Sequence, residues 1–372
     1  MLTQVEVVKD RQRLCAIRPA WDSLWRQSGA SVFQSHRWIT AWSNECSDAL
    51  RLACAWRGDE LVAVLPLCIR SWHGLRVLEW AAQSFSDYCD AMVPDGWQPI
   101  ELLWDAVTRI GGFDLVRLKH IRPDAAVQPL LQGVGIEERV ETCLQVACQW
   151  PSGEAWFRNL NKKTRNNYTR GKRILGESGP IVFRQLADDE PREPVIQRLL
   201  ALKRHWVENR DAPLVRSDTT LLSLTEALHQ MGSLRIFVIE CAGTIIAGSI
   251  NAIHRDRMLA LFATYDAAYE RASPGILLMT DYTIWGFDHG ITEIDYLLGA
   301  EPYKFRYANR EVKLHIFIAG KTLRGRLALA AYQRLRRYSQ PTIPSVTIGS
   351  AYLTEKGTPR KPPKKAKASA AA

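Results

Sequence analysis

The sequence predicts an α/β protein built from two copies of one unit, each with a mixed sheet flanked by helices. Two stretches of the same rhythm support this prediction. Residues 52–80 and 236–263 each read as three apolar strands separated by turns, with Gly58 and Gly74 in the first stretch and Gly243 in the second. The stretches start about 185 residues apart and helical patterns flank both, which indicates a tandem duplication.

The first half is expected to contain a strand, two helices, the first meander, a strand, a helix and two strands. Four tryptophans at helical spacing, Trp21, Trp25, Trp38 and Trp42, indicate helix faces that pack into a core. The predicted ranges are Gln4–Val8, Ala20–Gln27, His36–Cys46, 52–80, Tyr88–Val93, Pro99–Ile110, Phe113–Leu118 and Thr142–Ala147.

The second half is expected to begin with a strongly basic helix that Gly176 ends. The predicted ranges are Ala155–Leu175, Ile181–Leu186, Pro194–Asn209, Thr219–Gln230, 236–263, Pro274–His289, Glu293–Leu298, Val312–Ala319 and Leu323–Tyr338. We therefore place one domain at residues 1–150 and a second at 151–340, with a basic linking helix at 155–175. The Pro-, Lys- and Ala-rich residues 341–372 are predicted to be a disordered tail.

Composition is that of a globular protein, with 47% hydrophobic and 24% charged residues in a chain of 372. The first residues lack the apolar segment of a signal peptide, and no apolar run reaches the roughly 18 residues that span a bilayer. The eight cysteines include no C-x-x-C pair or zinc-type spacing, so they are expected to be reduced thiols. These features predict a cytoplasmic protein without a metal site.

The net charge of +10 is concentrated in three blocks. Arg158–Arg173 holds seven Lys/Arg, Lys321–Arg337 holds six and Lys356–Lys367 holds six, and the first two contain no acid. Such blocks attract phosphates, nucleic acid or an anionic membrane surface, although a solvated helix face gives the same pattern. In the first block, Arg165 and Arg170 are candidates to reach phosphates of a donor substrate.

The turn Ser273-Pro274-Gly275 follows an apolar strand and opens a helix. A glycine at that point lets an anion approach the backbone N–H groups, and the helix dipole favours negative charge there. Ser273, Gly275 and Ile276 are therefore candidate anion ligands. Tyr265 and Asp266, which come directly after the strand, lie where substrate atoms would pass, but Asp266 also suits a simple turn.

The stretch from Leu259 to Tyr307 resembles the acyl-CoA-binding half of the GNAT acyltransferase superfamily. Its short Ser-Pro-Gly turn and the later segment Gly299…Tyr303-Lys304-Phe305 are similar to the branch that includes CelD-type cellulose-biosynthesis proteins and FemAB aminoacyl transferases. The resemblance implies that Lys304 aids acyl transfer, with Tyr303 and Glu301 beside it. A surface ion pair between Lys304 and Glu301 is the structural alternative.

The segment Phe85–Asp90 in the first half is similar to a Ser-Asp-Tyr segment of the CelD-like family. It implies that Asp87 faces a cleft between the domains and acts as a base for the acceptor, although a capping or turn role fits Asp87 equally well. We therefore expect Lys304 and Asp87 on opposite walls of one interdomain active site.

By this resemblance, the protein transfers an acyl group, with acetyl-CoA or another acyl-CoA as cosubstrate. The acceptor would be an amine or hydroxyl of a sugar, a peptide, or an envelope or exopolysaccharide precursor. Two alternatives stay open: a FemAB-like transferase that uses aminoacyl-tRNA, and a non-catalytic accessory protein of exopolysaccharide (cellulose) biosynthesis. The basic segments also suit peripheral contact with the inner membrane surface.

Overall fold

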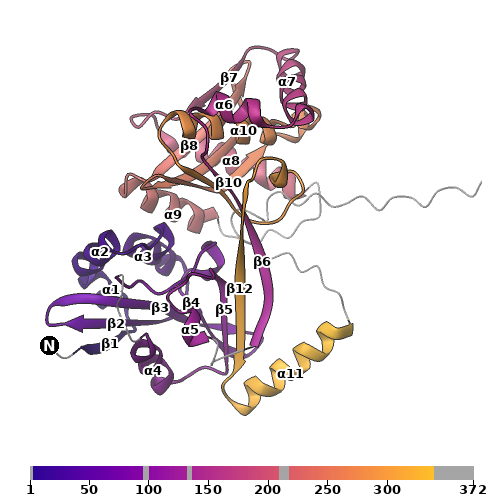
Figure 1. Cartoon of the computed structure of the whole chain (residues 1–372). Coiled ribbons are helices and arrows are strands. Elements are labelled where there is room, and N and C mark those ends of the chain that lie inside the picture. The colour runs from indigo at the N-terminus through magenta and orange to yellow at the C-terminus, as the bar shows by residue number, and fades with distance from the viewer. Residues whose placement is uncertain (1–2, 95–99, 132–135, 209–217, 339–372) are drawn as a thin grey trace, which may run out of the picture.

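The computed structural model describes residues 3–94, 100–131, 136–208 and 218–338 (Figure 1). The twelve described strands form one continuous sheet in the order β1-β2-β3-β4-β5-β12-β6-β11-β10-β9-β8-β7. This confirms the predicted mixed α/β class, with helices packed on the sheet. The tail predicted at 341–372 lies outside the described residues.

Among the described residues of the first half, eleven α-helices and strands confirm most of the predicted elements. They are β1 (Gln4–Val8), α1 (Arg11–Ala16), α2 (Arg18–Gln27), α3 (His36–Glu45), β2 (Ala49–Arg57), β3 (Glu60–Trp72), β4 (Leu75–Trp80), α4 (Glu101–Ile110), β5 (Leu115–Ile121), α5 (Gln128–Leu131) and β6 (Ile136–Ala147). Two short 3-10 helices, η1 (Val32–Gln34) and η2 (Gln83–Phe85), lie between them.

The second half repeats the succession of helices and meander. Its elements are α6 (Gly153–Asn159), α7 (Lys162–Gly176), β7 (Ile181–Gln185), α8 (Arg192–Glu208), α9 (Asp218–Gln230), β8 (Leu234–Cys241), β9 (Thr244–His254), β10 (Arg257–Tyr265), η3 (Ala267–Ala272), α10 (Pro274–Asp288), β11 (Glu293–Leu298), η4 (Lys304–Arg306), β12 (Arg310–Gly320) and α11 (Leu323–Tyr338).

The last strand of each half completes the sheet of the other half. Strand β5 pairs with β12 and β11 pairs with β6, while β6 and β12 pair with each other from Gln145 and Arg310 onward. Counted from either edge of the sheet, the first four strands pair antiparallel with one another. The fifth strand pairs parallel with the fourth, and the sixth strand pairs antiparallel with the fifth. We call β1–β5 with β12 unit 1, and β7–β11 with β6 unit 2. The units share strands across the boundary predicted near residue 150.

A repeated β-bulge gives independent support for duplication. On β5, the step from Leu118 to Ile121 spans three residues opposite two on β12. On β11, the step from Asp295 to Leu298 likewise spans three residues opposite two on β6. The residue before the end of each step has a left-handed backbone, with φ of 59° at His120 and 56° at Leu297. Such a backbone is uncommon for residues other than glycine, so its recurrence marks equivalent positions.

The tryptophan-bearing helices α2 and α3 pack into the core of unit 1, as predicted. Trp21, Trp38 and Trp42 are buried. Two of their indole N–H groups find partners, because Trp21 donates to the carbonyl of Gln34 (2.9 Å) and Trp38 donates to the Ser86 hydroxyl (3.1 Å). Helix α3 also packs against α9 of unit 2, so this core helps to hold the units together.

Two sequence predictions of local structure were wrong. The basic helix predicted at Ala155–Leu175 is two helices, because Leu160 and Asn161 adopt extended backbones and the Asn161 side chain caps α7 by accepting from the Thr164 amide (2.9 Å). The strand predicted at Tyr88–Val93 is an irregular segment that makes one bridge, between Met92 and Val64. The apolar pattern of that segment reflects its burial and not regular strand pairing.

None of the described helices is long and apolar enough to cross a membrane. All eight cysteines are free thiols. Within the ranges that the structure describes, no group of three or more His, Cys, Asp or Glu side chains is placed to hold a metal ion.

Candidate active site

Strands β10 and β11 separate soon after they begin, which opens a gap in the sheet of unit 2. They pair only over Arg257–Leu259 and Glu293–Asp295, and β10 then carries a bulge between Ala260 and Phe262. The last paired residues, Leu259 and Asp295, form the vertex of this gap. Beyond the vertex, the N–H and C=O groups on the facing edges of β10 and β11 cannot bond to each other, so they require other hydrogen-bond partners.

The turn at the far end of β10 offers less to an anion than the sequence suggested. Ser273 has a left-handed backbone, and Pro274 has no N–H group. The amides of Ile276 and Leu277 both donate to the Ser273 carbonyl, at 3.0 and 3.2 Å. Of the N–H groups in the first turn of α10, this leaves the one of Gly275 to bind a ligand. A Cβ at Gly275 would lie 3.2 Å from the Tyr265 ring, so the turn and β10 are in close contact.

Asp266 has a structural role at this turn. Its carboxylate accepts from the Ala268 amide (3.0 Å), which caps η3, and it pairs with Arg198 at 3.3 Å. These contacts agree with the simpler of the two roles that the sequence allowed for Asp266, that of a turn residue.

Helix α7 lies against η3 and α10, beside the Ser273-Pro274-Gly275 turn. Gly171 allows this approach, because a Cβ there would be 2.6 Å from the Ala272 carbonyl oxygen. Tyr168 and Lys172 both donate to the buried carboxylate of Asp281 on α10, Lys172 at 3.1 Å. Burial raises the pKa of Asp281, although Lys172 opposes that shift.

The two arginines predicted to bind phosphate on α7 have different environments. Arg165 donates to the carbonyls of Arg158 (2.5 Å) and Leu160 and so completes the end of α6. Arg170 is exposed and immediately precedes Gly171, where α7 touches η3. Of the pair, Arg170 is the one that stands free to meet a ligand near the turn.

Lys304 lies in the interior instead of facing a cleft. Its side chain is 2% exposed, and its ammonium donates to the carbonyls of Tyr296 (2.9 Å) and Leu298 (3.2 Å) at the bulged end of β11. The Gly299 carbonyl (3.4 Å) and the buried carboxylate of Glu301 (3.0 Å) complete its surroundings. An ammonium has three donors, and four acceptors surround this one, so none is left for an acyl oxygen.

The partners of Lys304 are held by the same short segment. Gly299 has φ of 118°, and a Cβ there would lie 2.6 Å from the Glu301 carboxylate oxygens. Tyr303 is half-buried and packs against the apolar core of unit 2. The ion pair with Glu301 that the sequence offered as an alternative is present, but it is buried and not on the surface.

Asp87 meets Lys304 at one residue of β11. The Asp87 carboxylate, 1% exposed, accepts from the Leu298 amide (3.2 Å), while Lys304 donates to the Leu298 carbonyl. The structure thus brings the two predicted catalytic residues together, from both units. It places them around the backbone of one buried residue, Leu298, and not on opposite walls of an open cleft.

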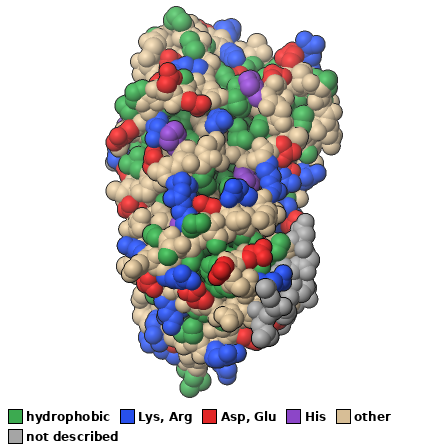
Figure 2. Space-filling view, turned by 90° about the vertical axis from the view of Figure 1, so that its left-hand side faces the viewer, with side chains coloured by type: hydrophobic (Ala, Val, Ile, Leu, Met, Phe, Trp, Pro, Cys, Tyr) green, Lys and Arg blue, Asp and Glu red, His purple; other side chains and the backbone are tan. Residues whose placement is uncertain are grey.

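A cavity of about 530 Å³ lies where the two units meet. It reaches Leu259 and Asp295 at the vertex of the gap, and Tyr88, Asp90 and Arg122 from unit 1. Figure 2 shows Lys and Arg side chains in a band across the middle of the molecule. This band lies at the same level as the junction of the upper and lower parts in Figure 1.

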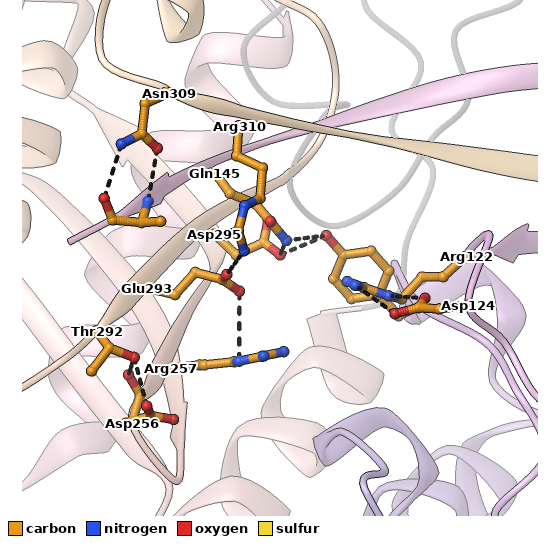
Figure 3. A network of polar contacts seen from close by, with 12 residues as sticks. Arg122, Asp124, Gln145, Asp256, Arg257, Thr292, Glu293, Asp295, Asn309 and Arg310 are labelled. Atoms are coloured by element: carbon orange, nitrogen blue, oxygen red, sulfur yellow. Dashed lines mark hydrogen bonds and ion pairs between the residues drawn. The ribbon is translucent and has the colours of Figure 1, made fainter. Parts of the chain in front are cut away.

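Asp295 is the central polar group of this cavity (Figure 3). The Tyr88 hydroxyl donates to one carboxylate oxygen (2.5 Å), and the Gln145 amide donates to the same oxygen (2.8 Å). The Leu297 amide donates to the other oxygen (2.8 Å). Burial raises the pKa of Asp295 to about 6, against these hydrogen bonds, which lower it. A carboxyl group with such a pKa exchanges protons near neutral pH.

Charged pairs line the rest of the cavity (Figure 3). Arg122 makes two bonds to Asp124, at 2.8 and 3.2 Å, and its guanidinium lies 5.3 Å from the centre of the Tyr88 ring. Glu293 pairs with Arg310 (2.9 Å) and with Arg257 (3.7 Å).

Asp90 has a structural role in the cavity wall. It accepts from the amides of Ala126 and Val127, and burial raises its pKa to about 7. It therefore holds the wall of the cavity in place.

The sequence placed Asp295 among the polar residues at the exit of a buried strand, but it assigned no role to Asp295, Tyr88 or Gln145. The signal for Asp295 was present, since it is an acid inside an otherwise apolar strand. Gln145 carried no signal, because its role depends on β6 pairing with a strand of the other half.

Residues 162–305 match the family model described as an acetyltransferase (GNAT) domain. The second half of the chain contains a GNAT acyltransferase domain. The match runs from α7 to η4, so it includes the Ser273-Pro274-Gly275 turn, the gap between β10 and β11, and Lys304. An acyltransferase is the class of enzyme that this domain identifies.

Solved structures share the fold over nearly the whole chain. FemX aligns with a TM-score of 0.58 and 10% identity, over 92% of this chain and all of that one. The C-terminal domain of a putative lysylphosphatidylglycerol synthetase from Agrobacterium fabrum aligns with a TM-score of 0.54 and 10% identity, over 87% of this chain and 97% of that one. L-PGS from Bacillus licheniformis aligns with a TM-score of 0.53 and 12% identity, over 87% of this chain and 96% of that one. No curated protein matches the chain.

Proposed function

We propose that this protein transfers an acyl group from acyl-CoA to an amine or hydroxyl of an acceptor bound in the cavity between the units. The observation that carries the proposal is the position of the cavity, which reaches the vertex where β10 and β11 separate. A sugar, a peptide, or an envelope or exopolysaccharide precursor is the proposed acceptor, because the cavity is lined by paired charges and hydrogen-bonding groups and is not an apolar slot.

In this proposal the donor lies along the gap between β10 and β11. The Gly275 amide and the start of α10 hold an anionic group of CoA, and Arg170 adds a positive charge beside them. The strand from Tyr265 back to Leu259 spans about 20 Å, so an extended arm bound along it brings the thioester to the vertex.

The proton acceptor in this proposal is Asp295, assisted by Tyr88. The acceptor nitrogen or oxygen attacks the thioester carbonyl, the C–S bond breaks, and the departing thiolate ends as the CoA thiol. The acceptor's proton passes to the Asp295 carboxylate, either directly or through the Tyr88 hydroxyl that donates to it. Asp87 was the sequence candidate for this role, but its described bond holds the Leu298 amide at the end of β11.

Lys304 acts in the proposal as a positioning residue. By binding the carbonyls of Tyr296 and Leu298, it fixes the bulged end of β11 next to the gap. The geometry of Asp295, three residues earlier, depends on that bulge.

A second candidate donor is an aminoacyl-tRNA, as in the FemAB-like alternative. The specific observation in its favour is that the turn retains one ligand-facing amide, while α7 beside it exposes Lys162, Lys163 and Arg170. A weak pyrophosphate site next to an exposed basic helix suits a large polyanion.

Calorimetry separates the two donors. Acetyl-CoA and CoA are titrated into the wild-type protein and into Gly275→Val, which fills the space in front of the Tyr265 ring. Gly176→Val at the end of α7 is the matched control, because its Cβ would have only an ordinary contact, 4.0 Å from Ile181.

We expect acetyl-CoA binding that Gly275→Val abolishes and Gly176→Val preserves. Absence of binding at millimolar acetyl-CoA would remove the CoA proposal. Binding of aminoacyl-tRNA that weakens when Arg170 is replaced by Gln would then support the second candidate.

A further inference from the structure

Helix α11 presents an apolar stripe to solvent. Leu323 and Leu327 are 74% and 64% exposed, the two highest values among the exposed large hydrophobic side chains of the described residues. Ala330 and Ala331 are also exposed and continue the same line at helical spacing. In Figure 1 the helix starts at the end of β12 and extends away from the body of the protein.

The first turn of α11 fixes which way this stripe faces. Gly325 packs so closely on the loop before β5 that a Cβ would lie 1.9 Å from the Asp114 carbonyl oxygen. The Thr322 hydroxyl donates to the Asp114 carboxylate (3.0 Å) and accepts from the Gly325 amide (3.1 Å). Because Gly325 must face the body, Leu323 and Leu327 must face outward.

Basic side chains flank the stripe. Lys321, Arg324, Arg326 and Arg334 are exposed, and the sequence from Lys321 to Tyr338 contains no acid. Arg324 donates to the Gly74 carbonyl (2.8 Å) in the turn between β3 and β4. That turn follows Trp72, a further exposed large apolar side chain at 42%.

We propose that α11, together with the tip of the β3–β4 hairpin, docks on an anionic lipid surface. Exposed leucines flanked by arginines on one helix are the composition of a helix that lies in a membrane interface. Each basic residue near an anionic surface adds to the attraction, and tryptophan is favoured at the headgroup level. This inference is independent of which acyl donor the enzyme uses.

The same face is poorly suited to a second copy of the chain. A stable dimer buries roughly 1,200 Å² or more in total, whereas the stripe consists of two leucines and two alanines. Two copies meeting through this face would also bring like-charged arginines together. Nucleic acid would account for the arginines but leaves the outward-facing leucines without a role.

Flotation with lipid vesicles tests the proposal on the full-length protein. One set of vesicles contains phosphatidylcholine with about one third phosphatidylglycerol, and the other contains phosphatidylcholine alone. The variants are Leu323→Gln with Leu327→Gln, and Arg326→Gln with Arg334→Gln. Val182→Gln on β7 is the matched control, since Val182 is an exposed apolar residue (47%) on the far edge of the sheet.

We expect binding to the anionic vesicles only, with at least a tenfold loss in the leucine variant, a loss in the arginine variant and none in the control. Circular dichroism and thermal unfolding establish that each variant is folded. The proposal is overturned if the protein ignores both vesicles, or if the leucine variant binds as tightly as the wild type. It is also overturned if light scattering without lipid shows a dimer that the leucine variant abolishes, or if only RNA binds and the leucine variant retains that binding.

Discussion

At the scale of single residues, the interior polar groups at the meeting of the units have definable chemistry. Asp295 is buried and receives hydrogen bonds from Tyr88, Gln145 and the Leu297 amide. Lys304 donates to two carbonyls at the bulged end of β11. The first group is proposed to move a proton and the second to hold the backbone, and substitutions distinguish these roles.

Asp295 should make stability depend on pH in a defined direction. Its pKa is about 6 in the folded protein and about 3.9 when unfolded. Between these values the unfolded chain loses the proton and the folded protein keeps it, so the free energy of unfolding falls as pH rises from about 4 to 6. Relative to Asp295→Asn, wild-type stability should fall by roughly 2 kcal/mol over that window, as measured by denaturant unfolding.

Tyr88→Phe is the matched variant for that measurement. It removes a hydrogen bond that lowers the pKa of Asp295, so it should extend the loss of stability to higher pH. A wild-type protein and an Asp295→Asn variant with parallel pH profiles would show that Asp295 titrates normally, and the proposed proton acceptor would be lost with it.

Replacement of Lys304 should act first on stability. Lys304→Met leaves the Glu301 carboxylate buried without its cation, which typically costs about 3–5 kcal/mol. The double variant Lys304→Met with Glu301→Gln should recover part of that loss, because no buried charge then remains. Lys313→Met breaks the exposed pair with Glu311 and should change stability by less than about 1 kcal/mol.

These Lys304 changes are measured by urea unfolding. A Lys304→Met variant as stable as Lys313→Met, but with reduced turnover, would contradict the positioning role and restore the direct catalytic role implied by the family resemblance.

At the scale of elements, α7 combines a packing face and a charged face. Gly171, Tyr168 and Lys172 attach it to η3 and α10. Arg165 serves the end of α6, while Arg170 points to solvent beside the proposed donor site. Two arginines of one basic helix are thus expected to have separate effects.

Arg165→Gln and Arg170→Gln should give opposite patterns. Arg165→Gln should lower stability by about 1 kcal/mol, because it removes hydrogen bonds to the last carbonyls of α6, with little effect on donor affinity. Arg170→Gln should weaken donor binding and flatten its dependence on salt, with little effect on stability. Calorimetry at two salt concentrations and thermal unfolding measure both. If donor affinity is unchanged in Arg170→Gln, the exposed side of α7 is only a solvated face.

At the scale of the whole molecule, the exchange of β6 and β12 makes the two units interdependent. Each unit closes its sheet with a strand that the other half of the chain encodes. The cavity forms at the same junction, with Tyr88 from unit 1 and Asp295 from unit 2. Stability and the proposed site therefore depend on the same contact.

Separating the halves at residue 150 should prevent folding of each alone. The fragment 151–338 lacks β6 and exposes the edge of β11, while the fragment 1–150 lacks β12 and exposes the edge of β5. Mixing the two fragments should restore the fold, because all strands are then present. Circular dichroism and size-exclusion chromatography report both results.

A chimera provides the control for that experiment. Joining residues 1–131 to 308–338 by a flexible linker supplies β12 to unit 1 and should yield a soluble, cooperatively unfolding protein. Cooperative folding of the fragment 151–338 by itself would show that β6 is dispensable, against the interdependence described here.

Local patterns were enough to predict the α/β class, the duplication and most elements, because apolar periodicity and turn residues are local signals. The two meanders, the helix from Pro274 and the basic segment were all predicted from such patterns, and the match of residues 162–305 agrees with the acyltransferase class. The Lys304–Glu301 pair was also foreseen as an alternative.

The positions of the side chains at the proposed site depend on contacts between distant parts of the chain. The burial of Lys304 and Asp87 follows from the bulge in β11, and the contact of Tyr88 with Asp295 joins residues 207 positions apart. Gln145 joins that contact because β6 pairs with a strand of the other half, and such strand exchange leaves no local pattern in the sequence. Which strands pair is set by packing between distant parts of the chain. The proposed site consists of residues that this pairing brings together.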